Sequence, residues 1–177
     1  MSATARSTVD LLSDAVRGVA SATTIEDALR ALARVLQEDF ALWRVSVIRF
    51  PTGSRHIEIV AAWSANEIIL VPGNRIAIDL TPATRQLSET LQSGRPAMFR
   101  SDSIDLGLLN DLMRDEGVAS WLGLPLFGCD QVVAVLSLSS SNPDAFGEAD
   151  ILFFKGLAAG IQKQLISLLP VDTDITP

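Results

Sequence analysis

The stretch VASWLGLPLF-GCDQ-VVAVLSL, residues 118–138, decides the fold of this chain. Two apolar runs of strand length flank GCDQ, whose glycine and aspartate are typical of a tight turn. Asn142-Pro143-Asp144 then breaks the second run, and an apolar helical pattern continues from Glu148 to Leu169. The last third of the chain therefore predicts a strand, a hairpin turn, a strand, a loop and a long helix.

Upstream of this hairpin, the period of the apolar residues changes several times. Ser7 with Asp10, and Thr24 with Asp27, have the spacing of helix caps, and apolar residues then recur at every third or fourth position. Consecutive β-rich runs joined by turn residues predict antiparallel pairing. The expected fold is α+β, with about six mainly antiparallel strands and helices on both faces. The pattern predicts helices over 7–19, 24–36, 81–94 and 106–116, strands over 43–50, 55–63, 75–80 and 96–99, and a turn at 51–54.

Composition and charge restrict the class of protein. The 177 residues, 48% of them hydrophobic, suit one domain, which we place at 7–169 between flexible tails at 1–6 and 170–177. The net charge of −7 without a basic cluster argues against direct binding of nucleic acid. No apolar run approaches the roughly 20 residues of a membrane span, and no signal peptide is visible. We expect a cytoplasmic protein that does not bind membranes.

Six short segments, in this order and at this spacing, resemble GAF domains, which are small-molecule sensory modules of bacterial signalling proteins. The resemblance spans Thr23 to Leu169. It implies an antiparallel sheet with a pocket on one face and a helical bundle on the other. It also implies that the state of a bound ligand is passed through the terminal helices to a partner or output domain. The segments are TIEDAL (24–29), VSVIRF (45–50), LQSGRP (91–96), SWLGLPL (120–126), VVAVLSLS (132–139) and NPDAF (142–146).

The residues that GAF relatives use for cofactors or catalysis are mostly missing. Bilin-binding members use a cysteine in the pocket, but the single cysteine, Cys129, falls in the predicted turn. Haem would need a histidine, and the only one, His56, lies beside a turn. The cyclic-nucleotide pattern is absent, and one cysteine cannot form the internal disulfide of the free-methionine-sulfoxide reductases. We therefore expect no cofactor, no metal and no enzymatic activity.

The hairpin register predicts which side chains share a face of the sheet. If Phe127 opposes Val132, then Ser120, Leu122, Ser137 and Ser139 share one mixed face, whose apolar walls and hydroxyls suit a ligand pocket. The opposite face, which includes Leu136, would pack on the terminal helices. The alternative is that the serines line a filled core, and a register error of one residue would exchange the faces.

Further candidate ligand-binding residues lie in the segments that flank the predicted sheet. Arginines there would suit a carboxylate or a phosphate, through the planar guanidinium. The alternative for each residue is an ordinary surface position. These candidates are Trp63, Arg75, Arg100, Asp102, Asn110 and Arg114.

The first and last helices both carry apolar seams. We expect these seams to join two chains in a parallel homodimer through a four-helix bundle, although both could instead pack within one monomer. The preferred function is a sensory domain that binds an unknown small molecule. The alternative is a structural dimerisation module with a filled pocket. The predicted interface residues are Val9, Leu12, Val16, Val19, Phe154, Ile161, Leu165 and Leu168.

Overall fold

A computed structural model describes residues 6–50, 55–66 and 71–170. The predicted turn at 51–54 and nearly all of the two predicted tails lie outside the described residues. The helices are α1 (Thr8–Ala20), α2 (Ile25–Phe40), α3 (Pro82–Gln92), α4 (Leu108–Asp115) and α5 (Ile151–Leu168), with a 3-10 turn at Glu148–Asp150 before α5. The strands are β1 (Leu42–Arg49), β2 (His56–Ser64), β3 (Arg75–Ala77), β4 (Ala97–Arg100), β5 (Ser120–Gly128) and β6 (Gln131–Ser140).

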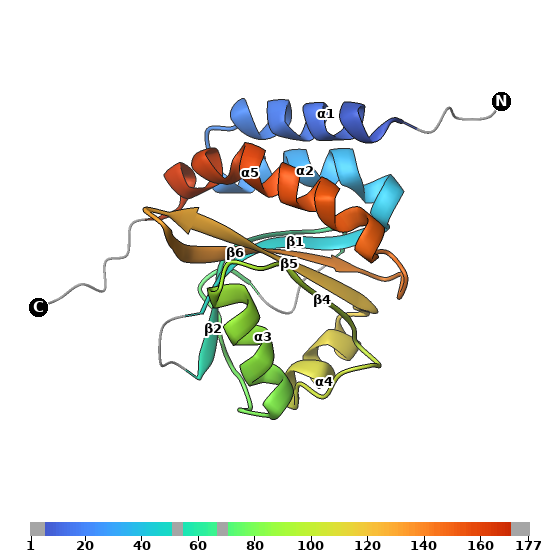
Figure 1. Ribbon diagram of the computed structural model, residues 1–177, viewed down its shortest axis with the longest axis vertical. Coiled ribbons are helices and arrows are strands. Elements are labelled where there is room, and N and C mark those ends of the chain that lie inside the picture. Colours follow the sequence, from blue (N-terminus) through green and yellow to red (C-terminus); the bar gives the residue numbers. More distant parts are fainter. Residues whose placement is uncertain (1–5, 51–54, 67–70, 171–177) are drawn as a thin grey trace, which may run out of the picture.

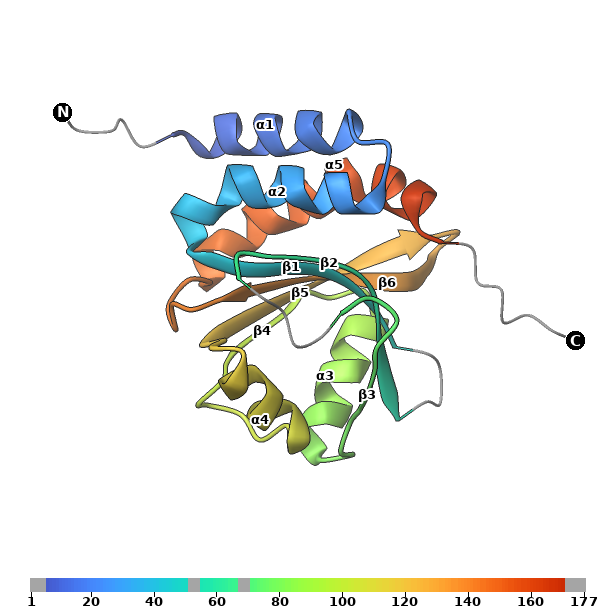
Figure 2. The same cartoon turned by 180° about the vertical axis from the view of Figure 1, so that it is seen from behind.

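The six strands form one antiparallel sheet in the order β3-β2-β1-β6-β5-β4. Figure 1 shows α1, α2 and α5 on one face of this sheet and α3 and α4 on the other. Figure 2 shows from behind that α1 lies beyond α2 and α5, as an outer layer. The predicted fold class, an α+β fold with helices on both faces, is confirmed.

Local sequence signals set where the elements begin and turn. The side chains of Ser7, Thr24 and Thr81 each accept a hydrogen bond from the backbone N–H three residues further on, as N-caps of α1, α2 and α3. At the tip of the β5–β6 hairpin, Cys129 and Asp130 both have positive φ, which is the backbone of a tight turn that matches strand twist. The predicted caps and the predicted turn are therefore confirmed.

Two hydrophobic cores separate along the two faces of the sheet. The larger core lies between the sheet and α1, α2 and α5, and contains Leu124, Leu136 and Phe154. The smaller core lies between the sheet and α3 and α4, and contains Ile59, Leu87 and Trp121. A cavity beside the smaller core is the candidate site described below.

The hairpin register differs from the predicted one by a single residue. Phe127 does pair with Val132, but Leu126 pairs with Ala134 instead of Val133, because a β-bulge leaves Val133 as an extra residue. Every side chain of β5 beyond the bulge therefore points to the face opposite to the predicted one, whereas β6 keeps its predicted faces. Trp121 faces α4, and Leu122 faces the large core.

The predicted seam between two chains is largely buried within one chain. Val19, Phe154, Ile161 and Leu165 are at most 1% exposed, inside the core that α1, α2 and α5 share. Because the seam residues of α5 are covered by α1, α2 and the sheet, they are not available to a second chain in this fold. Within one chain these side chains pack as the alternative, packing within one monomer, expects. Leu12, Val16 and Leu168 are half-buried against the same core, and Val9 is exposed.

Small residues on α5 explain how α1 covers it. Gly156 lies against the side chain of Leu12, and Gly160 lies against that of Val16. Successive turns of α1 therefore contact successive turns of α5, which makes the two helices parallel. Figures 1 and 2 show this arrangement.

Candidate ligand-binding cavity

The candidate site is a cavity between the sheet face and helices α3 and α4. Its space free of protein atoms is about 620 Å³, counted to its mouth. Phe50, Ile76 and Leu109 on its wall are only half-buried, so the cavity is not fully enclosed on their side. That figure includes open solvent at the mouth, and the volume that compares with cavities in other proteins is about 80 Å³. Its apolar lining is Ile48, Phe50, Ile57, Ile59, Ile76, Leu87, Phe99, Leu109, Leu112, Met113, Val118 and Trp121.

A strip of polar side chains crosses this apolar lining on the two central strands. In the antiparallel pairing of β1 with β6, Arg44 lies opposite Ser139, and Ser46, two residues further along β1, lies opposite Ser137. All four residues line the cavity. Alternation along a strand brings them to one face, because residues two apart point the same way. The polar strip is thus built by strand pairing.

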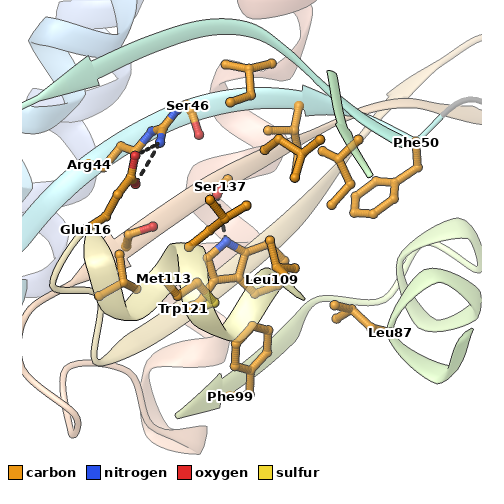
Figure 3. A pocket seen from close by; sticks show the side chains of 17 residues that line it. Arg44, Ser46, Phe50, Leu87, Phe99, Leu109, Met113, Glu116, Trp121 and Ser137 are labelled. Atoms are coloured by element: carbon orange, nitrogen blue, oxygen red, sulfur yellow. Dashed lines mark hydrogen bonds and ion pairs between the residues drawn. The ribbon is translucent and has the colours of Figure 1, made fainter. Parts of the chain in front are cut away.

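An ion pair between Arg44 and Glu116 closes one end of the strip. Nη1 of Arg44 donates to both carboxylate oxygens of Glu116, at 3.1 and 2.9 Å, and both side chains are only 5% exposed. Glu116 is the C-cap of α4, and Gly117 follows with a φ of 71°, which turns the chain toward β5. Figure 3 shows the pair spanning from β1 to the end of α4. The pair therefore ties α4 to the centre of the sheet.

Trp121 forms part of the cavity wall and its position is fixed by three contacts. Its Nε1 donates to the Ser137 hydroxyl at 2.7 Å, and its ring stacks on Phe99 with centroids 5.1 Å apart. The indole also lies across Gly123, where a Cβ would overlap the ring. Figure 3 shows the indole beside Ser137 and Phe99. Gly123 therefore makes room for Trp121 on this face of the sheet.

Two of the hydroxyls in the strip have no hydrogen-bond partner among the described residues. Ser46 is 3% exposed and Ser139 is 5% exposed, yet neither side chain makes a hydrogen bond with any described residue. Their oxygens are not fully buried but open to the cavity, where water or a bound molecule can serve as the partner. Both line the cavity, so a molecule inside it can supply the missing partner.

Of the predicted ligand-binding residues, Ser137 and Ser139 line the cavity. Ser120 and Leu122 do not, because the bulge turns them to the other face. Ser120 donates to the carbonyl of Asn142, and Leu122 is buried in the large core. Trp63 also packs against that core.

The remaining predicted residues do not line the cavity either. Arg100 is exposed and pairs with Asp102 and Asp144. Arg114 is exposed and pairs with Asp111 one helical turn away, and Arg75 lies exposed on the edge strand β3. Asn110 has a structural role, because its Nδ2 donates to the carbonyls of Ser101 and Ile104 and so holds the loop before α4.

Sequence reasoning missed Arg44, Ser46, Glu116 and Trp121. The signal for the first two was present, because Arg44 and Ser46 lie two residues apart in the otherwise apolar run 42–48 and so share one face. Trp121 was assigned to the wrong face by the register error. Nothing in the local pattern indicated that Glu116 reaches Arg44, since 72 residues separate them.

Metal, thiol and imidazole chemistry would each need its groups gathered at a site. In that part of the chain, no three His, Cys, Asp or Glu side chains gather closely enough to hold a metal ion. Cys129 is exposed in the hairpin turn, and His56 is exposed at the start of β2. None of the helices within 6–50, 55–66 and 71–170 combines the length and apolar character needed to cross a bilayer.

The GAF domain family model matches residues 22–163. Several solved structures share the fold. A free methionine-R-sulfoxide reductase from Neisseria meningitidis, in complex with its substrate, is 18% identical with a TM-score of 0.67, over 95% of this chain and 96% of that one. A phycocyanobilin-bound GAF domain from a cyanobacterial phytochrome is 14% identical with a TM-score of 0.66, over 93% and 97% of the two chains. The GAF domain of an Acinetobacter phosphoenolpyruvate-protein phosphotransferase is 16% identical with a TM-score of 0.65, over 93% and 96%.

These likenesses correct one expectation. We predicted no enzymatic activity, yet a chain that matches this one over almost its whole length is a reductase. The fold therefore does not exclude catalysis, and the prediction is wrong in excluding it. At these identities the likenesses show the fold alone. No curated protein sequence matches the chain.

Proposed function

Because the chain belongs to the GAF domain family, we propose that it is a sensory module that binds a small molecule in the cavity between β1, β6 and α4. GAF relatives include proteins solved with a small molecule bound, such as the phycocyanobilin-bound domain. The proposal for this chain is that its own ligand occupies the space above the polar strip of Arg44, Ser46, Ser137 and Ser139.

The observation that carries the proposal is the pair of unsatisfied hydroxyls inside an unfilled cavity. In a filled core the backbone or a neighbouring side chain would satisfy Ser46 and Ser139, whereas both hydroxyls here face the cavity without a hydrogen bond to a described residue. Apolar walls with a few convergent polar groups are the usual composition of a ligand site. The alternative function, a structural dimerisation module with a filled pocket, is less well supported for the same reason.

The path by which such a ligand would signal runs through the sheet. Arg44 and Ser46 line the cavity, while Val45 and Val47 of the same strand are buried against the helical layer. A ligand that shifts β1 would therefore shift the surface on which α2 rests, and α2 in turn contacts α1 and α5, since packed layers transmit displacement. We propose that α1 and α5 pass this change to a signalling partner or output domain.

The proposal includes a cytoplasmic location and a homodimer. The seam residues buried in one chain do not support that dimer, but two exposed side chains offer a different surface. Val9 is 74% exposed on the first turn of α1, and Leu152 is 81% exposed on the first turn of α5. Any pairing of two chains through the helical layer would use this outer surface of α1 and α5.

Native mass spectrometry of protein prepared from its own host tests ligand binding. The wild-type chain should carry an additional small mass. Ser46→Phe, which fills the cavity, should lose it, whereas the exposed control Ser13→Phe should keep it. Circular dichroism shows whether each variant is folded.

A second readout compares unfolding temperatures in a host metabolite extract and in buffer, because a ligand stabilises the state that binds it. The wild type and Ser13→Phe should gain stability in the extract, and Ser46→Phe should not. A wild-type protein that carries no small molecule and gains no stability contradicts the proposed function.

A further inference from the structure

We infer that the cavity selects an uncharged small molecule, with a flat apolar body and a hydrogen-bonding edge that meets Ser46 and Ser139. This inference rests on the proposed function and adds the chemical class of the ligand. Three features of the cavity carry it: its charge balance, its unsatisfied hydroxyls and its aromatic wall.

The charge balance disfavours an ionised ligand. Among the described residues that line the cavity, Arg44 and Glu116 are the ionised ones, and they neutralise each other at 2.9 Å. Both are almost fully buried, so their attraction is weakly screened by water. A ligand with a carboxylate would have to displace Glu116 from Arg44, and a cationic ligand would have to displace Arg44 from Glu116. Either displacement leaves a buried charge without this counter-ion, which is strongly unfavourable.

The positions of the polar side chains along the strip determine which hydrogen-bonding groups the edge of the ligand must carry. Ser139 lies beside Arg44 and Ser46 lies beside Ser137, so the two unsatisfied hydroxyls belong to adjacent rows of the sheet. A hydroxyl both donates and accepts. The Ser137 oxygen already accepts from Trp121. An amide, lactam or similar neutral group, which carries a donor and an acceptor side by side, can therefore satisfy Ser46 and Ser139 together.

The apolar body is set by the remaining wall. The stacked rings of Trp121 and Phe99 form one side, and isoleucines of β1, β2 and β3 form another. The indole plane is held in place by Ser137 and Gly123, so it offers a fixed flat surface. Flat rings pack well against such surfaces.

Three nearly isosteric probes test the inference: benzamide, benzoate and benzamidinium, which are neutral, anionic and cationic near neutral pH. Isothermal titration calorimetry on the whole chain should show benzamide binding at least about tenfold more tightly than either ion, because the ions must break the buried pair. Ser46→Ala and Ser139→Ala should each weaken benzamide about fivefold, the usual value of one hydrogen bond. The exposed control Ser13→Ala should leave the affinity unchanged.

Two charge variants reverse the selection if the inference is right. Glu116→Gln leaves a net positive cavity lining and should make benzoate the best of the three probes. Arg44→Gln leaves a net negative lining and should favour benzamidinium. Circular dichroism verifies that each variant is folded, and the serine variants keep the test decisive if a charge variant is not.

The outcomes separate this inference from the proposed function. If the wild type binds benzoate or benzamidinium as tightly as benzamide, or if it binds none of the probes, the inference is overturned. A charged molecule found bound to the wild type from its own host would overturn it as well, while supporting the proposed function. The proposed function fails separately, if the wild type from its own host carries no small molecule and gains no stability in the extract.

Discussion

Single residues determine which side chains of β5 and β6 face the cavity and which face the helical layer. The alternation of Ser137 and Ser139 with Leu136 and Leu138 placed the faces of β6 correctly from sequence. The same reasoning failed on β5, because one extra residue, Val133, shifts the partner of every residue beyond it. A bulge depends on how both strands pack, and no single residue type announces it. The error moved Trp121 out of the predicted pocket and Leu122 into it.

Gly123 is a residue whose size can be tested directly. In Gly123→Ala, the new Cβ would overlap the indole of Trp121, which is held by Ser137 and Phe99. We expect a loss of about 1–3 kcal/mol in the free energy of unfolding, the usual cost of overpacking, with a shift in tryptophan fluorescence. Gly147→Ala is the control, because a Cβ there meets only ordinary contact with Asp150. Equal stabilities of the two variants would contradict this role for Gly123.

Leu136 tests the assignment of the opposite face. It is fully buried in the core between the sheet and the helices. Leu136→Ala should lower the free energy of unfolding by about 2–5 kcal/mol, because it removes a buried side chain and leaves a cavity. Val133→Ala on the same strand, where the side chain is 39% exposed, should cost much less. Chemical denaturation measures both, and a loss under about 1 kcal/mol at Leu136 would mean that the face is wrong.

At the scale of elements, the sequence predicted existence and type well, because caps, turns and apolar periods are local signals. The boundaries of β3 and α4 differ by a few residues from the predicted ones, and a contact between distant residues lies at the start of α4. A carboxylate oxygen of Asp79 accepts from the N–H of Leu108 at 3.0 Å and caps α4 there. The placement of α4 over the cavity was not predictable, because it depends on Arg44 and Glu116, which are distant in sequence.

The Arg44–Glu116 pair should control how firmly α4 closes the site. Glu116→Gln should cost about 3–5 kcal/mol, because one partner of a buried ion pair is removed. Hydrogen exchange over residues 108–115 should then become faster, since α4 loses its tie to β1. Asp111→Asn, which removes an exposed pair with Arg114 on the same helix, should change stability by less than about 1 kcal/mol.

A double variant separates the ion pair from simple packing. Arg44→Met with Glu116→Leu removes both charges, so it should recover much of the stability that Glu116→Gln loses. Equal effects of Glu116→Gln and Asp111→Asn on exchange in α4 would show that the pair does not hold the helix.

On the scale of the whole molecule, the sheet has a cavity on one side and a helical layer on the other. The predicted dimer treated the apolar seam of α5 as surplus surface, but α1 lies over α5 and covers it. The sequence contained part of the reason, because Gly160 leaves room for Val16, where a Cβ would come too close. To predict this packing from the sequence, one must know that α1 and α5 are neighbours. The sheet topology determines that they are neighbours, and the local sequence pattern does not.

This arrangement reverses what a charge on α5 should do. Ile161 is 1% exposed, so Ile161→Glu places an unpaired charge inside the helical layer and should unfold the chain instead of producing a folded monomer. Leu152→Glu on the same helix alters a side chain that is 81% exposed, and it should keep the stability of the wild type. Circular dichroism and sedimentation velocity on both variants measure folding and mass together. If two chains do pair through the outer surface of α1 and α5, Leu152→Glu is the variant that gives a folded monomer. A folded monomer from Ile161→Glu would instead show that this residue is reached by a second chain, and would contradict the packing of α1 over α5.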